Sequence, residues 1–263
     1  MIIEIWIALG IAGLITVVTR VKNALTWPGV LMADAMLIFI TCMSGLQEAL
    51  ALIGMYLAVF AVDMILGKKI EYATKEIHGK GGTRGIKQVL ANGAAGCVCV
   101  LLYKITGEFA FLIAYYASIF EVMADSIASD VGVLSKQPPR DICTWREVPR
   151  GISGGVSVLG LLSSGVACVV GGLLAGIMLQ TKVLYVLIII IVPYLGMLTD
   201  SIIGSKMQVK YTCGVCGIHT ELAEHCGTKT IVSGGRKEIS NGMVNAICTV
   251  FAACLGYLFA VLL

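Results

Sequence analysis

Long apolar segments are the feature of this sequence that most restricts its fold. Of the 263 residues, 58% are hydrophobic and only 13% are charged, and the mean hydropathy is +0.92, which lies far outside the range of soluble domains. A helix needs about 17 to 25 mostly apolar residues to cross a bilayer core. Eight segments meet this requirement: 2–19, 29–46, 49–66, 88–105, 109–133, 152–180, 183–207 and 242–263. The sequence therefore predicts an all-α, polytopic transmembrane helical bundle, a single domain over residues 1–263.

Basic residues gather on one side of the predicted membrane. Of the 19 Lys and Arg, only Lys104 and Lys182 fall on the other side. By the positive-inside rule the connections rich in these residues are cytoplasmic. They are a basic loop at 67–87, an Arg-rich loop at 134–151 and a loop with Cys and His at 208–240. Both termini are then extracytoplasmic, and the first span, which has no basic n-region and no A-x-A site, is expected to be retained.

Hydrophilic residues recur four apart at the cytoplasmic ends of five predicted spans. Residues at positions i, i+4 and i+8 share one face of a helix. Lipid penalises such a stripe unless the stripe faces another one or a wet cavity. The five stripes consist of Arg84, Gln88 and Asn92; Glu121, Asp125 and Ser129; Ser153 and Ser157; Asp200, Gly204 and Gln208; and Asn241 and Asn245. The sequence therefore predicts one polar cavity that opens to the cytosol.

Acidic residues inside the spans give the strongest indication of chemistry. Glu121, Asp125 and Asp130 belong to one predicted helix, and Asp200 lies near the end of another. An ionised group at the bilayer centre costs about 2.5 to 3.5 kcal/mol on insertion scales, and less near the interface. Mg²⁺ would offset this cost, because one or two carboxylates, waters and phosphate oxygens are its usual ligands. Asp130 lies about 140° around an ideal helix from Asp125 and needs a kink, a frayed end or another partner. The alternative is that these acids pair with Arg or Lys from loops.

Two connections have the composition of a phosphate site. The segment HGKGGTRGIKQ is rich in Gly and basic residues, so its backbone amides can approach an anion, although it contains no P-loop motif. The next cytoplasmic connection supplies three arginines and then small residues at a predicted helix start, where unpaired amides favour an anion. These residues are Arg140, Arg146, Arg150, Ser153, Gly154, Gly155 and Ser157. Carboxylates for a metal beside cations for phosphates indicate phosphoryl transfer rather than acyl transfer.

The last cytoplasmic connection carries candidate zinc ligands. Cys213-Gly-Val-Cys216 is followed within ten residues by two histidines, His219 and His225, and by Cys226. Three cysteines and one histidine, which we take as His225, are compatible with a tetrahedral site. The alternative is a reduced loop with incidental thiols. Four protein ligands leave no open position on the metal, so zinc would be structural and would shape the loop that covers the cavity.

Several short motifs resemble one known family. They are RGIKQVLANG, ADSIASDVG, the run from Arg140 through REVPRGISGGVS, DSIIGSKMQ, the CGVCG and HCG segment, and NGMVN. In this order they are similar to the transmembrane protein 19 family, also called domain of unknown function 92, whose plant members include the chloroplast phytyl-phosphate kinase. The resemblance covers about Arg84 to Asn245. It implies a polytopic enzyme, distantly similar to CTP-dependent lipid kinases and phosphatidate cytidylyltransferases, that phosphorylates a prenyl monophosphate.

The resemblance also implies roles for single residues. It implies Mg²⁺ held by Asp125 and Asp200 with Asp130 nearby, and Arg146 joins these three as the catalytic set. Together with the stripes and the loops, it gives as substrate- and nucleotide-binding residues Arg84, Gln88, Asn92, Glu121, Ser129, Arg140, Arg150, Ser153, Gly154, Gly155, Ser157, Gln208, Asn241 and Asn245. Arg146 stands where the family pattern has Lys, and Gly242 interrupts an expected Asn pair, so the nucleotide and the acceptor stay open.

Two other functions fit part of this pattern. A secondary transporter also uses intramembrane carboxylates and Gly-broken helices, but its site lies near the midplane. A lipid cytidylyltransferase uses the same groups and releases pyrophosphate. We predict a CTP-dependent prenyl or phytyl monophosphate kinase of a bacterial or archaeal cytoplasmic membrane, which binds a prenyl-phosphate lipid and a nucleoside triphosphate. The net charge of +3 is too small to indicate nucleic acid, and both a monomer and a homo-oligomer fit.

Overall fold

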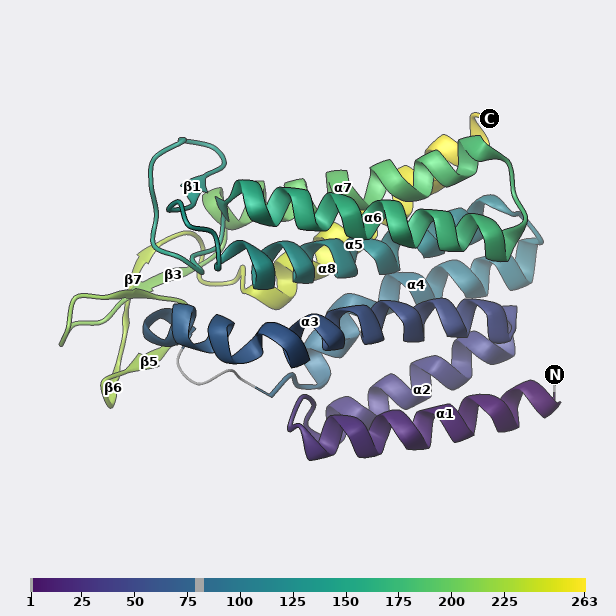
Figure 1. Cartoon of the computed structure of the whole chain (residues 1–263), viewed down its shortest axis with the longest axis horizontal. Coiled ribbons are helices and arrows are strands. Elements are labelled where there is room, and N and C mark those ends of the chain that lie inside the picture. The colour runs from purple at the N-terminus through teal and green to yellow at the C-terminus, as the bar shows by residue number, and fades with distance from the viewer. Residues whose placement is uncertain (1, 79–82) are drawn as a thin grey trace.

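Eight long helices form the bundle in the part of the chain that the computed structural model describes, residues 2–78 and 83–263 (Figure 1). They are α1 (Ile2–Val21), α2 (Trp27–Ser44), α3 (Leu46–His78), α4 (Ile86–Thr106), α5 (Ala110–Gly132), α6 (Val158–Leu179), α7 (Val183–Lys206) and α8 (Asn241–Val261). Each is long and apolar enough to cross a membrane. The predicted transmembrane helical bundle is confirmed.

Helix α5 lies in the middle of the bundle. In an apolar stretch of 18 residues, 83% of its residues are buried, against 17% to 39% in the other seven helices. It packs against α3, α4, α6, α7 and α8. Its Tyr115 and Tyr116 are fully buried, and the Tyr115 hydroxyl donates to the backbone oxygen of Glu48 at 2.6 Å. Most positions of α5, including that of Glu121, therefore face protein rather than lipid.

Small residues let neighbouring helices approach α5 closely. Gly160 of α6 crosses α5 where a Cβ atom would stand only 2.6 Å from the backbone oxygen of Ala128. Ser157 ends the preceding loop there: its Oγ accepts from the Gly160 amide at 3.2 Å and donates to the Gly132 oxygen at 3.0 Å. The hydroxyl thus caps α6, where the first amides have no helical partner, and ties α6 to the end of α5.

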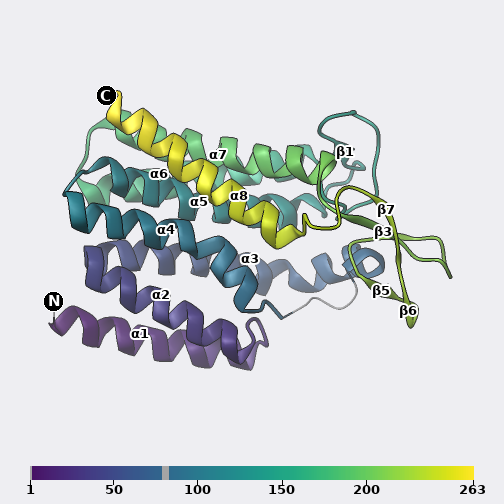
Figure 2. The same cartoon turned by 180° about the vertical axis from the view of Figure 1, so that it is seen from behind.

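All the described strands lie at one end of the bundle, and both chain termini lie at the other (Figures 1 and 2). We call the first the loop end. Between α5 and α6, β1 (Arg140–Asp141) pairs with β2 (Gly155–Val156) in antiparallel register. Between α7 and α8 there is an antiparallel sheet of order β4-β3-β7 and a separate β5-β6 hairpin. These strands are β3 (Lys210–Thr212), β4 (His219–Thr220), β5 (Glu224–His225), β6 (Thr228–Lys229) and β7 (Ile231–Gly234).

The third helix is longer than predicted. The predicted span 49–66 and basic loop 67–87 are wrong in their boundary, because α3 continues to His78 as one helix of 33 residues. At 1.5 Å per residue this is about 50 Å, well beyond a hydrocarbon core of about 30 Å. Hydropathy falls where the helix leaves the lipid, but Lys68 to His78 contain no Gly or Pro to end it. Residues 79–82, which carry three of the four glycines of the predicted anion loop, lie outside the described residues.

The predicted start of the sixth span is also wrong. Helix α6 begins at Val158 instead of 152, because Gly151 and Gly154 have φ of +88° and +87°, which a helix excludes. Ser153 and Ser157 therefore do not share a helix face. Helix α7 ends at Lys206, so Gln208 lies beyond the helix that carries Asp200. The short strands of the loops were not predicted either.

Replacing Gly160 with Ala is expected to loosen the contact between α5 and α6. The new Cβ meets backbone atoms that cannot swing aside, and overpacking of this kind costs about 1–3 kcal/mol. The matched control is Gly165→Ala on the same helix, whose Cβ would lie 3.7 Å from the Tyr194 ring in ordinary contact. Thermal unfolding of both variants in detergent measures the difference, and equal melting temperatures would contradict this packing.

Candidate active site

Two acidic side chains meet where α5, α7 and α8 converge near the loop end. Glu121, Asp200 and Cys248 each offer a ligand atom, and these three atoms lie within 4.8 Å of one another. Gly196 makes room for this contact, since a Cβ there would stand 2.4 Å from the Glu121 Cγ. Gly196 and Asp200 are four apart, so both lie on the face of α7 that meets α5. Only 1% of Glu121 is exposed, so this carboxylate is shielded from lipid, whereas Asp200 is half-buried.

Asp125, one turn after Glu121, extends the acidic group toward the loops. Its carboxylate is within electrostatic range of Asp200, Asp130 and Arg84. The Arg84 backbone is held by the connection between α1 and α2: its amide donates to the Ala24 oxygen, and its oxygen accepts from the Thr26 amide, both at 3.0 Å. A cation whose backbone is fixed therefore lies within electrostatic range of Asp125.

Three oxygen atoms at this end are buried without a hydrogen-bond partner among the described residues. They are Asp200 Oδ2, Gln208 Oε1 and Asn245 Oδ1. The amide nitrogens of the same residues are satisfied: Asn245 donates to Asn92 Oδ1 at 3.1 Å, and Gln208 donates to Ser153 Oγ at 2.7 Å. A buried acceptor left unpaired costs about 1–3 kcal/mol. All three are acceptors, so what would satisfy them is a donor or a cation.

The two large loops interlock above these acids. The Ser153 amide donates to Glu221 Oε1 at 2.9 Å, and the Ser153 hydroxyl donates to the same oxygen. Glu221, which follows β4, is in turn within electrostatic range of Asp200. Gly154 rests on α7, where a Cβ would stand 2.4 Å from the Ser205 Cα. Its predicted role as an open anion-binding turn is therefore not seen: the Ser153 amide is already occupied, and Gly154 serves close packing.

A second contact fastens the loop between α5 and α6 to α7. Ser205 Oγ donates to Asp141 Oδ2 at 2.6 Å, and Asp141 Oδ1 accepts from the amides of Cys143 and Thr144 at 3.0 and 2.8 Å. Burial alone raises the pKa of Asp141, but these hydrogen bonds outweigh it and hold the pKa below its usual value. The hydrogen bonds to Asp141 therefore stabilise the fold at pH values above the ordinary pKa of an Asp. This stabilisation is lost as the pH falls through the lowered pKa of Asp141.

The structure brings together part of the predicted set. Helices α4 and α8 are joined through Asn92 and Asn245, and Thr249 donates to the Ala91 oxygen at 3.1 Å. Gln88 lies partly buried in the first turn of α4, whereas Ser129 and Asn241 are exposed. Gly204 packs on Ser153, with a would-be Cβ 3.2 Å from the Ser153 Cβ, and Gly155 lies in β2.

The three predicted phosphate-binding arginines of the loop between α5 and α6 are exposed. Arg140 pairs with Glu147 at 3.7 Å between side chains that are more than half exposed, a contact of little energetic weight. Arg150 donates to the Ser135 oxygen at 2.8 Å. Arg140 and Arg150 therefore contact their own loop. The predicted zinc ligands form a separate cluster between α7 and α8.

Sequence reasoning missed several residues of this site. In the sequence, Cys248 is indistinguishable from the other small apolar residues of its span. Glu221 and Asp141 belong to loops without a recognisable motif. One available signal was the spacing of Cys248, three residues after Asn245 and thus near the same face of α8. For Glu221 no sequence signal existed, because its position depends on the fold of the whole loop.

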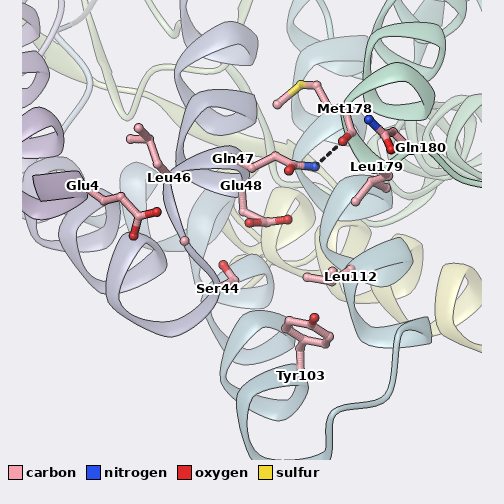
Figure 3. A pocket seen from close by; sticks show the side chains of 11 residues that line it. Glu4, Ser44, Leu46, Gln47, Glu48, Tyr103, Leu112, Met178, Leu179 and Gln180 are labelled. Atoms are coloured by element: carbon pink, nitrogen blue, oxygen red, sulfur yellow. Dashed lines mark hydrogen bonds between the residues drawn. The ribbon is translucent and has the colours of Figure 1, made fainter. Parts of the chain in front are cut away.

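A polar pocket of about 580 Å³ lies at the opposite end of the bundle, among the ends of α2, α3, α4 and α6 (Figure 3). Glu48 and Tyr103 line it, and the Gln47 side chain donates to the Met178 oxygen at 2.7 Å. None of its lining residues belongs to the loop-end site.

Comparison with known proteins identifies the family. The sequence model described as integral membrane protein DUF92 matches residues 10–253. The chain belongs to this family. Similar proteins include an uncharacterized membrane protein of Methanocaldococcus jannaschii, 32% identical over 130 residues, which are 48% of this chain and 52% of the relative. No solved structure matches the chain.

Two proteins of Arabidopsis thaliana are also similar. Protein VTE6, chloroplastic, is 26% identical over 170 residues, or 58% of this chain and 49% of the relative. Protein PGR is 27% identical over 204 residues, or 67% of this chain and 69% of the relative. The chain thus spans about half the length of the archaeal protein and of VTE6. The family that the motifs resemble is confirmed.

Replacing Ser205 with Ala is expected to free the loop between α5 and α6 from α7. The variant loses a hydrogen bond to a carboxylate, worth about 1.5 kcal/mol or more, which corresponds to about tenfold faster tryptic cleavage at Lys136 to Arg150. The control is Thr199→Ala on the same helix, whose hydroxyl donates to the Leu195 oxygen of its own helix. Cleavage of both variants at the wild-type rate would argue against this anchor.

Proposed function

We propose that the loop end is the site of a Mg²⁺-dependent phosphotransferase, which transfers a phosphoryl group from a nucleoside triphosphate to a prenyl or phytyl monophosphate. The observation that carries the proposal is the meeting of Glu121 and Asp200 beside Asp125, on the contacting faces of α5 and α7, with Glu121 buried. Acidic residues inside a membrane span are energetically costly, so their presence indicates a function.

The residues present fit Mg²⁺. This ion prefers oxygen ligands, usually one or two carboxylates completed by waters and phosphate oxygens. Glu121 and Asp200 supply two carboxylates within 4.8 Å, and Asp200 Oδ2 has no partner among the described residues. Cys248 is a soft thiol and is not counted as a ligand. When bound, Mg²⁺ would neutralise charge on the donor phosphates during transfer.

The other residues of the site would position the reactants. Arg84, held by backbone hydrogen bonds near Asp125, supplies positive charge for a phosphate. The free acceptor oxygens of Gln208 and Asn245 can receive hydrogen bonds from bound water or from a sugar hydroxyl. A phosphate monoester is largely ionised near neutral pH, since its second pKa is about 6, so the acceptor needs no general base. Positioning and charge then do the catalysis.

The choice of substrates rests on the family. The motifs resemble a family whose plant members include the chloroplast phytyl-phosphate kinase, and this resemblance supports a prenyl acceptor and CTP as donor. The positive-inside rule supports a cytoplasmic location of the loop end, since Lys104 and Lys182 are the described basic residues of the opposite end. The prenyl tail would lie among the spans, where each buried CH₂ contributes about 0.8 kcal/mol.

The reaction products decide between the candidate functions. Purified protein is incubated with Mg²⁺, a series of prenyl monophosphates of different length and each of CTP, ATP, GTP and UTP. We expect a lipid diphosphate and a nucleoside diphosphate, identified by mass spectrometry. Pyrophosphate together with a nucleotidyl lipid would instead establish a cytidylyltransferase. Uptake of a labelled solute by proteoliposomes without nucleotide, with no lipid product, would establish a transporter.

Replacing Asp200 with Asn is expected to lower turnover about 100-fold or more, because the metal site loses the charge that holds the ion. The side chain keeps its size, so the protein is expected to elute as the wild type does in detergent. The control is Asp34→Asn, whose carboxylate accepts from Thr16 between α1 and α2 at 2.9 Å, and it is expected to retain activity. Wild-type turnover in Asp200→Asn would remove this residue from the metal role.

A further inference from the structure

Four soft ligands converge in the loop between α7 and α8, away from the acidic group. Cys213, Cys216, His225 and Cys226 each offer one ligand atom, and these atoms lie within 4.8 Å of one another. Cys216 Sγ and Cys226 Sγ lie 3.4 and 3.3 Å from His225 Nδ1. Two ligands bound to one tetrahedral zinc, at 2.3 Å for sulfur and about 2.0 to 2.1 Å for nitrogen, are about 3.6 Å apart. The observed separations are close to this value.

Tight turns on both sides present these ligands. In the first, the Gly217 amide donates to the Cys213 oxygen at 2.9 Å, and Gly217 has φ of +73°. The second turn joins β5 and β6, where Cys226 and Gly227 have φ of +51° and +72°. Positive φ at both central residues defines a type I′ hairpin turn. A non-glycine residue in this region is uncommon, and here it brings the Cys226 sulfur beside His225.

The segment between α7 and α8 has only a small apolar core to hold such turns together. Its described strands contain two to four residues each. Three of its larger apolar side chains, Val215, Ile231 and Val232, are exposed. Tyr211, Ile218 and Leu222 are half-buried, and Val209 is buried. Each of the three cysteines is a free thiol. Small units of this kind usually depend on a cross-link, and a metal is one way to provide it.

We infer that Cys213, Cys216, His225 and Cys226 bind one structural zinc ion. Three thiolates and one imidazole in tetrahedral arrangement match zinc, whereas Mg²⁺ and Ca²⁺ require oxygen ligands. With four protein ligands the ion has no open position and holds the loop rather than reacting. The inference concerns the metal content of the loop, so it stands or falls independently of the phosphotransferase proposal.

The zinc cross-link also explains how the loop reaches the acidic group. Strand β4 follows directly on the Cys216 turn, pairs with β3 and contacts α3. Glu221 comes next and accepts hydrogen bonds from Ser153. The ion therefore fixes the strand that positions Glu221 over the end of α7. Removing it is expected to free this segment while leaving the helices in place.

Metal analysis of the purified full-length protein tests the inference. We expect one zinc per chain in the wild type, loss of zinc in Cys226→Ser, and one zinc in the matched control Cys143→Ser, a free thiol of the other loop. X-ray absorption at the zinc edge should show three sulfurs at about 2.3 Å and one nitrogen at about 2.0 to 2.1 Å. Wild type without zinc, iron in its place, or zinc retained in Cys226→Ser would overturn the assignment.

Two further measurements test the inference even if Cys226→Ser fails to fold. His225→Cys is expected to keep one zinc with four sulfur neighbours, which a merely structural histidine would not produce. Chelation of zinc from the wild type should speed tryptic cleavage at Lys210 and Lys229 without changing the elution of the helical bundle. Cleavage unchanged by chelation would overturn the structural role of the ion.

Discussion

The cost of placing carboxylates within a membrane span governs the architecture. Glu121 and Asp125 lie on a helix that five others enclose, so neither has to face lipid. This enclosure requires close approach of the neighbouring helices, and Gly196 provides it on α7. Asp200 then reaches Glu121 because it lies one turn beyond that glycine. The position of the acidic group thus follows from which helix is central and from where its neighbours carry no side chain.

Hydropathy and periodicity predicted what depends on single helices. For seven of the eight spans, at least one end of the helix lies close to its predicted position. The predicted polar stripes of α4 and α8 face one another, since Asn245 donates to Asn92. The length of α3 escaped prediction because hydropathy marks the edge of the lipid, not the end of the helix. The start of α6 escaped it because the glycines at 151 and 154 break the helix where Gly154 meets Ser205, a contact between distant parts of the chain.

In the loops, too, the features that depend on local spacing were predicted, and the contacts between distant residues were not. The convergence of three cysteines and a histidine followed from their spacing, since tight turns bring near neighbours together. The partnership of Ser153 with Glu221, and that of Asp141 with Ser205, joins residues 64 or more positions apart. Spacing within one segment carries no information about such pairs. The basic composition of the loop between α5 and α6 is ambiguous in the same way, because a basic loop satisfies the topology rule by its charge alone, whether or not its arginines bind a phosphate.

The unpaired acceptors come both from the helical bundle and from the loop that follows α7. Asp200 belongs to α7 and Asn245 to α8, whereas Gln208 lies in the loop that continues from α7, so the three buried oxygens come from both sides of the junction. Buried polar atoms are normally paired, and three left open at one junction carry a cost of about 1–3 kcal/mol each. Helix packing alone gives no reason to keep them, because apolar residues of similar size would fill the same space at no such cost. Cations or hydrogen-bond donors that enter from the loop end would satisfy these oxygens, so their retention there is better explained by a ligand than by stability.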